Sequence, residues 1–334
     1  MSAVVTPQGS THFAVLDGWR AVSILLVLAG HLLPLGAGPI QLNAPIAAMG
    51  MVLFFILSGF LITTTLANNL DLRIFIVRRL FRIVPLAWVV MIILLVLAKA
   101  PIDTWLGNLL FYANLPPQRL VEGGGHLWSL CVEMQFYLGI AVFVAVLGRR
   151  ALIALPLLAL AITAARIVAG RYVDIVTWYR CDEILAGGTL AIAYAGWYGD
   201  RVQKWLAWLS PYWLLPLLLL SAHPIGGPLN YARPYIAAAT IGATLYAPPP
   251  LLARLFATKA ASYIATTSYA IYIFHMALAA TWLGSGGTMV KYAKRPLLLA
   301  LTFAIAHLST FHFDWPCIAL AKRLTRHIKT RPAA

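Results

Sequence analysis

AVSILLVLAGHLLPL, residues 21–35, is apolar apart from Ser23, Gly30, His31 and Pro34, and Arg20 stands directly before it. On an α-helix rising ~1.5 Å per residue, Arg20 and His31 are about 16 Å apart. Arg20 is therefore expected at one membrane face, with His31 well inside the bilayer. An ionisable group at that depth is costly and marks a functional site by default. The alternative is a packed histidine that hydrogen-bonds to a neighbouring helix.

Composition extends this interpretation to the whole chain. Of its 334 residues, 61% are hydrophobic and only 10% are charged, against about 25% charged in soluble domains; the mean hydropathy is +0.83. We therefore expect one all-α, polytopic membrane domain over residues 1–334, with a basic cytoplasmic tail at 317–334. The formal net charge of +15 does not indicate nucleic-acid binding, because the basic residues cluster in short loops between apolar runs.

About ten apolar runs have a length suited to the ~30 Å core of a bilayer, although the first and eighth are short. The segment 101–115 is less apolar, and we expect it to be interfacial or re-entrant. The predicted spans are residues 19–35, 46–67, 83–99, 127–147, 151–169, 178–197, 206–221, 235–247, 261–283 and 296–313.

The distribution of Lys and Arg predicts the orientation, because cytoplasmic loops carry the excess of basic residues. With a cytoplasmic N-terminus, fifteen basic residues fall inside and six outside, so we expect both termini in the cytoplasm. The inside set is Arg73, Arg78, Arg79, Arg82, Arg149, Arg150, Arg201, Lys204, Arg254, Lys259, Lys322, Arg323, Arg326, Lys329 and Arg331. The outside set is Arg119, Arg171, Arg233, Lys291, Lys294 and Arg295.

The three cysteines, Cys131, Cys181 and Cys317, lie in or beside apolar runs and form no CxxC or Cys/His cluster. A lone cysteine in such a position usually behaves as a small hydrophobic residue. We expect no disulfide and no metal site.

Polar side chains are expected at two levels of the membrane. In the outer half, four spans bring together His31, Glu133, the group Arg180, Asp182 and Glu183, and His275. Each one alone is equally explained by interhelical hydrogen bonding. Their agreement in depth predicts a polar cavity capable of acid–base chemistry.

The second level is cytoplasmic and consists of Arg78, Arg79 and Arg82 in FIVRRLFRIVP, residues 75–85. Arg79 and Arg82 share a helix face, and two guanidinium groups on one face suit phosphate oxygens. The alternative is a topology signal that contacts lipid headgroups. In the second span, Ser58 and Gly59 permit either close helix approach or a polar wall to a cavity.

Six stretches, taken in order, resemble the bacterial acyltransferase 3 family of integral membrane acyltransferases. Together they reach from the first to the ninth span. They are LDGWRAVSILLVLAGH (16–31), MVLFFILSGFLIT (51–63), FIVRRLFRIVPLAW (75–88), HLWSLCVEMQFYL (126–138), RCDEILAGGTLA (180–191) and SYAIYIFHM (268–276).

The resemblance implies about ten spans in the bacterial inner membrane. It also implies transfer of an acyl group, usually acetyl from acetyl-CoA, to a hydroxyl of a carbohydrate such as exopolysaccharide or lipopolysaccharide O-antigen. The family's Arg-then-His pattern falls on Arg20 and His31, its paired arginines on Arg79 and Arg82, and its motif glutamate on Glu133.

Three positions depart from the family pattern. Cys131 replaces a small hydroxyl residue, Met134 follows Glu133 where a second acidic residue is common, and residues 314–316 read Asp-Trp-Pro where Glu-x-Pro is typical. These departures do not involve the expected chemistry.

The expected mechanism joins the two levels. Arg78, Arg79 and Arg82 would hold the nucleotide end of acyl-CoA, a donor substrate and not a resident cofactor. His31, with an imidazole pKa near ~6.5, would act as general base on the acceptor hydroxyl, and Glu133 would orient it. Direct transfer and an acyl-histidine intermediate both remain open. Substrate-binding or supporting roles are expected for Asp17, Arg20, Ser58, Arg180, Asp182 and His275.

Two other classes of function are compatible with such a chain. A secondary transporter or flippase also places charged residues around an intramembrane cavity, but the sequence shows no inverted repeat. A scaffold without chemistry leaves the set of polar residues at one depth unexplained. The sequence specifies neither the acceptor nor an oligomeric state.

Overall fold

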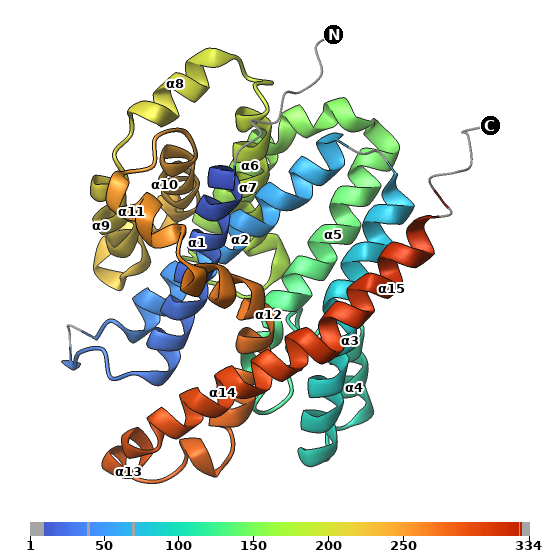
Figure 1. The fold of residues 1–334 in the computed structure, drawn as a ribbon, viewed down its shortest axis with the longest axis vertical. Helices are drawn as coiled ribbons and strands as arrows, with labels where there is room; N and C mark the ends of the chain where they lie inside the picture. Colours follow the sequence, from blue (N-terminus) through green and yellow to red (C-terminus); the bar gives the residue numbers. More distant parts are fainter. Residues whose placement is uncertain (1–9, 39–40, 69–70, 327, 329–334) are drawn as a thin grey trace. The chain divides into compact units, whose positions relative to one another are not determined.

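The computed structural model describes residues 10–38, 41–68, 71–326 and 328, and over these residues the chain is helical with no strand (Figure 1). The α-helices are α1 Ser10–Leu32, α2 Asn43–Asn68, α3 Leu72–Leu97, α4 Ile102–Leu109, α5 Trp128–Leu147, α6 Leu155–Val168, α7 Cys181–Tyr194, α8 Asp200–Trp208, α9 Pro211–Ala222, α10 Arg233–Tyr246, α11 Pro250–Phe256, α12 Lys259–Ala279, α13 Thr288–Ala293, α14 Arg295–Ser309 and α15 Trp315–Arg326.

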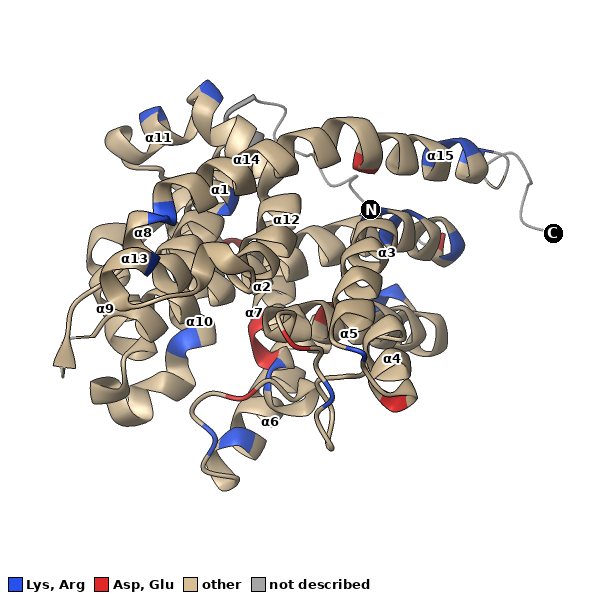
Figure 2. Cartoon of the chain, turned by 90° about the horizontal axis from the view of Figure 1, so that it is seen from below, with Lys and Arg blue, Asp and Glu red and all other residues tan. Residues whose placement is uncertain are grey.

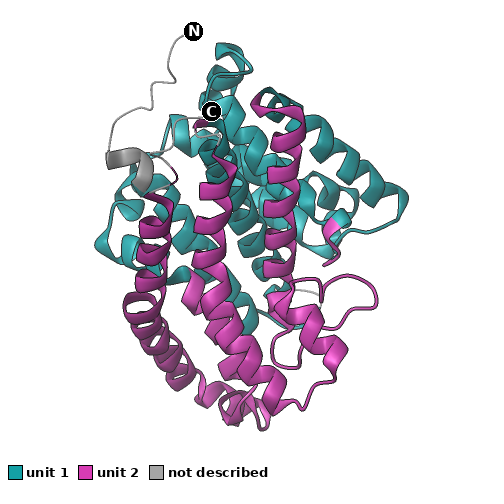
Figure 3. Cartoon of the chain, turned by 90° about the vertical axis from the view of Figure 1, so that its right-hand side faces the viewer, with its two compact units in different colours: residues 1–67, 150–174, 178–268 teal, residues 68–149, 175–177, 269–334 magenta. Residues whose placement is uncertain are grey.

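These helices form two compact units, which we describe separately (Figure 3). Unit 1 comprises residues 1–67, 150–174 and 178–268, and unit 2 comprises residues 68–149, 175–177 and 269–334. Helix α12 begins in unit 1 and ends in unit 2. This division does not test the prediction of one functional domain.

Unit 1 is built around α2, which is apolar and largely buried. Its core includes Val52, Leu53, Ile56 and Phe60, and α7 packs on both α6 and α10. The backbones of α2 and α7 are in direct contact, because a Cβ atom built on Gly59 would lie 1.9 Å from the carbonyl oxygen of Ile184. Glycine at this point permits the close helix approach that was one interpretation of residues 58–59.

In unit 2, α3 packs on α4, α5 and α15. The π-helical turn Thr310–Asp314 joins α14 to α15, and the three continue as one long rod (Figure 1). Residues 317–326 of the expected tail therefore belong to α15; their cytoplasmic location remains a prediction. Residue 328 is described as well, but 327 and 329–334 lie outside the described residues.

Among the described residues, six helices are long and apolar enough to cross a membrane, and the number rises to eight if each of two bent helix pairs counts as one span. The prediction of an all-α, multi-pass architecture is therefore confirmed. The count of ten is not, since α7 has only 14 residues and α12 is not among the six. The predicted spans 206–221 and 235–247 fall on the bent pairs, α8 with α9 at 85° and α10 with α11 at 90°.

Candidate functional site

Helix α1 carries three of the predicted site residues. Arg20 and Asp17 form an ion pair one turn apart at 3.4 Å, and both side chains are part-buried. His31 lies in the last turn of the helix and is exposed. The helix is anchored within unit 1 by Trp19, whose indole N–H donates to the Thr244 hydroxyl at 2.7 Å, and by Ser23, whose hydroxyl donates to the Gly50 carbonyl at 2.8 Å.

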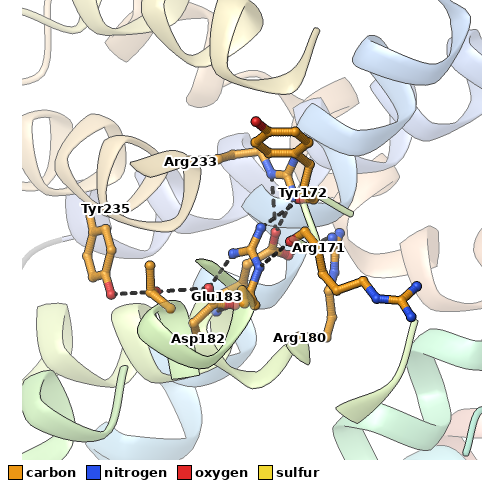
Figure 4. Close-up of polar contacts among 9 residues, drawn as sticks. Arg171, Tyr172, Arg180, Asp182, Glu183, Arg233 and Tyr235 are labelled. Carbon is orange, nitrogen blue, oxygen red and sulfur yellow. Dashed lines mark hydrogen bonds and ion pairs between the residues drawn. The ribbon is translucent and has the colours of Figure 1, made fainter. Parts of the chain in front are cut away.

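Arg180 and Asp182 belong to a buried cluster of charges in unit 1 (Figure 4). Arg166 on α6 forms an ion pair with Asp182 on α7. Glu183 forms ion pairs with two arginines, Arg180 at 3.2 Å and Arg233 at 3.2 Å, and it accepts hydrogen bonds from Arg233. We call these five residues the arginine–carboxylate cluster. All five are at most 3% exposed.

Neutral groups also form hydrogen bonds with this cluster. The Thr163 hydroxyl donates to Asp182 at 3.1 Å and is hydrogen-bonded to the Tyr235 hydroxyl at 2.8 Å. Arg166 also donates to the Tyr172 carbonyl at 2.7 Å. Charges taken out of water must be paired and hydrogen-bonded to be tolerated, so these contacts hold α6, α7 and α10 in register. The geometry favours a supporting role for Arg180 and Asp182.

Sequence reasoning missed two members of the cluster. Arg166 lies inside the predicted span 151–169, where an isolated charge was itself a signal. Arg233 was assigned to an outer loop, but it begins α10 and is fully buried. No periodicity in the sequence distinguishes a loop arginine from one that turns inward at a helix start.

In unit 2, helix α5 presents Glu133 next to an aromatic residue. The Tyr137 hydroxyl donates to the Glu133 carboxylate at 2.5 Å. The Arg79 guanidinium, on α3, lies 5.7 Å from the ring centroid of Tyr137 and 5.7 Å from that of Phe75. A cation above an aromatic face is attracted by the ring quadrupole. One continuous set of contacts thus joins the predicted donor-binding arginine to the predicted catalytic carboxylate.

A second polar group in unit 2 contains two histidines whose rings lie 5.0 Å apart, His126 and His275. His126 Nε2 is 3.2 Å from the Ile273 carbonyl, and His275 Nδ1 is 2.7 Å from the Tyr272 carbonyl. A carbonyl only accepts, so each bond requires a proton on that nitrogen and defines the tautomer of the neutral ring. His126, which sequence reasoning did not single out, is thereby paired with the predicted residue His275.

The other two predicted arginines lie on the surface of α3. Arg78 Nε donates to the Thr325 hydroxyl of α15 at 3.2 Å, and Arg82 is exposed. Basic residues of α3 and α15 lie at the same end of these packed helices (Figure 2). Neither helix contains an acidic residue, but Asp71 caps α3 and Asp314, directly before α15, interacts electrostatically with Arg82. The excess of basic residues suits an anionic ligand.

The predicted site residues divide between the two units. Unit 1 holds Asp17, Arg20, His31, Ser58, Arg180 and Asp182, while unit 2 holds Arg78, Arg79, Arg82, Glu133 and His275. Within each unit, contacts join Asp17 to Arg20 and Arg79 to Glu133 through Tyr137. The pairing of His31 with Glu133 and the two-level arrangement stay predictions. In the described part of the chain, no three His, Cys, Asp or Glu side chains are grouped so as to hold a metal ion.

Comparison with known proteins identifies the family. A family model described as an acyltransferase domain matches residues 13–313. The chain is also similar to the peptidoglycan O-acetyltransferase OatA of Listeria monocytogenes, with 26% identity over 359 residues covering 90% of this chain and 55% of the relative. The chain thus spans about half the length of this curated relative. No solved structure gives a significant match. The predicted acyltransferase is therefore confirmed, and the chain belongs to the acyltransferase 3 family.

Proposed function

We propose that this protein is a membrane O-acetyltransferase that moves an acetyl group from acetyl-CoA to a hydroxyl of a cell-surface carbohydrate. The observation that carries the proposal is the set of contacts from Arg79 through Tyr137 to Glu133 in unit 2. It joins an arginine suited to bind phosphate to a buried carboxylate suited to proton transfer. A transporter has no need of this particular connection, and family membership also favours an enzyme over the transporter alternative.

The donor's nucleotide end carries several phosphate charges, which suit the basic residues Arg78, Arg79 and Arg82 of α3. Arg82 is exposed there, and Arg79 is oriented by two aromatic rings. Guanidinium groups bind phosphate oxygens through paired, charge-assisted hydrogen bonds. Arg78, held by Thr325, would contribute its charge at the side of this surface that faces α15.

The transfer itself needs a base and a group that stabilises the protonated base. His31 would take the proton from the acceptor hydroxyl as the oxygen attacks the thioester carbonyl carbon. The carbon–sulfur bond then breaks, and the proton passes from the imidazolium to the departing CoA thiolate. Glu133 would stabilise the imidazolium in the way that the carboxylate of a catalytic triad does. In an alternative two-step route, His31 itself carries the acetyl group between donor and acceptor.

The acceptor class follows from the relative, whose name describes O-acetylation of peptidoglycan. Exopolysaccharide and lipopolysaccharide O-antigen offer the same chemical group, a carbohydrate hydroxyl. Such acceptors lie outside the bacterial inner membrane, in which we place this protein with both termini cytoplasmic.

A transfer assay with the purified full chain tests the proposal. Protein in detergent is given acetyl-CoA labelled in the acetyl group and a soluble glycan acceptor, and both labelled glycan and released CoA thiol are measured. Acetylated glycan is expected from the wild type and not from His31→Ala. Equal rates in the two proteins would refute His31 as the base, and release of no thiol by the wild type would refute the enzyme. Mass spectrometry of surface glycans from cells with and without the chain then identifies the acceptor.

A further inference from the structure

We propose that Asn43, the first residue of α2, is a positioning residue that holds the turn carrying His31. This inference rests on the proposed function only in giving His31 the catalytic role. The geometry lies wholly within unit 1.

The need for such a residue is visible in the sequence after Gly30. In an α-helix, the carbonyl of Gly30 would accept from the N–H of residue 34. Residue 34 is proline, which has no N–H. The last carbonyls of a helix already lack intrahelical partners, and here the proline removes one more donor. A donor from outside α1 is required for this carbonyl to be paired.

Asn43 supplies that donor. Its Nδ2 atom donates to the Gly30 carbonyl at 2.7 Å and to the Leu33 carbonyl at 2.7 Å. Its Oδ1 atom accepts from the backbone N–H of Leu35 at 3.2 Å. One side-chain amide thus uses both donors and its acceptor on the backbone on either side of His31.

The backbones of α1 and α2 also lie in direct contact at Gly30, which leaves no room for a side chain between them. A Cβ atom built on Gly30 would lie 2.6 Å from the backbone nitrogen of Ala47 and 2.6 Å from the carbonyl oxygen of Asn43. The last turn of α1 is therefore fixed against the first turn of α2. The backbone of this turn therefore sets the point from which the exposed His31 side chain projects.

Loss of the Asn43 amide should therefore act on turnover and not on donor binding. A misplacement of about 1 Å in a catalytic group can cost about 10²-fold in rate. We expect kcat of Asn43→Ala to fall by about 10- to 10²-fold, with an unchanged KM for acetyl-CoA, since the proposed donor arginines lie on α3. Asn43→Asp should be at least as damaging, because it places a carboxylate against two carbonyl oxygens. Asn43→Gln, which keeps both donors, should recover part of the activity.

Asn230 provides a matched control in the same unit. Its Nδ2 atom donates to the His223 carbonyl at 3.2 Å and to the Gly227 carbonyl at 2.9 Å. Asn230→Ala thus removes the same kind of contact from a turn that carries no predicted site residue. Its kcat should stay within a factor of about two of the wild type. An equal loss of kcat in Asn43→Ala and Asn230→Ala would overturn the positioning role.

Two further measurements separate positioning from general loss of structure. In a His31→Ala background, Asn43→Ala should cause no further loss of residual activity, because residues that act as a unit are non-additive; the same fold-loss in both backgrounds would overturn the inference. Hydrogen exchange of the amides of residues 31–35 should be faster in Asn43→Ala than in the wild type, and unchanged exchange would also overturn it. If the wild type has no transferase activity, the proposed function fails, and hydrogen exchange still decides whether Asn43 holds the turn.

Discussion

Replacement of Glu183 by glutamine should destabilise the protein strongly. Glu183 neutralises both Arg180 and Arg233 at 3.2 Å, and all three side chains are at most 3% exposed. Glu183→Gln keeps the shape but leaves two buried cations without a carboxylate. Removing one partner of a buried ion pair costs about 3–5 kcal/mol, which raises the ratio of unfolded to folded protein by about 10²- to 10³-fold at a tenfold change per ~1.4 kcal/mol. Thermal unfolding in detergent, followed by loss of helical circular dichroism, measures the effect.

Two matched variants make this prediction specific. Arg233→Met should lower the unfolding temperature less than Glu183→Gln does, because Glu183 then still forms an ion pair with Arg180. Asp103→Asn breaks the ion pair with Arg119, in which both side chains are more than 40% exposed, and such surface pairs contribute only about 0–1 kcal/mol. If Glu183→Gln unfolded at the same temperature as Asp103→Asn, the buried cluster would not support the fold as we argue.

Three further predictions concern the proposed chemistry and topology. His31→Ala should lower acetyl transfer by about 10²- to 10⁴-fold while acetyl-CoA binding is retained, and His275→Ala should have a smaller effect; the reverse order in the labelled-acetyl assay would move the base to α12. The double variant Arg79→Ala and Arg82→Ala should weaken acetyl-CoA binding by about 10²-fold or more, since each hydrogen bond to a charged group contributes roughly 1.5–3 kcal/mol; unchanged affinity by calorimetry would make both residues topology signals only. A reporter fused after Ala334 should be active in the cytoplasm, and activity in the periplasm would reverse the orientation.

Hydropathy predicts the long helices well because a bilayer core imposes both their length and their composition. The predicted spans 46–67 and 127–147 fall on α2 and α5 with boundaries within a few residues. Hydropathy does not predict the helices where apolar residues continue through a bend, as between α8 and α9, whose axes are bent by 85°. The bend follows Leu209, which has extended backbone, and precedes Pro211 at the first position of α9. An average over a window of residues does not detect such a break.

The site was predicted in its parts but not in its pairing. Each charged residue in an apolar run is visible in the sequence, and Glu133, Arg180 and Asp182 were found in this way. Their partners come from distant segments, as with Arg233 on α10, fifty positions after Glu183. Pairing over such separations is a tertiary property that no local spacing reports. By contrast, Asp17 and Arg20, one turn apart on the same helix, form a pair that helical geometry alone predicts, and so do Glu133 and Tyr137.

Burial separates the charged residues of the apolar helices into two kinds with different consequences for function. Asp182 and Glu183 are fully buried and matched with arginines, so their charges are used within the protein and stabilise unit 1. His31 and Arg82 are exposed, and exposed groups are accessible to a substrate. The cost of placing a charge at membrane depth thus identifies residues that matter, but burial and pairing distinguish supports from reacting groups. On this criterion His31 remains the strongest candidate for the base and the arginine–carboxylate cluster is part of its scaffold.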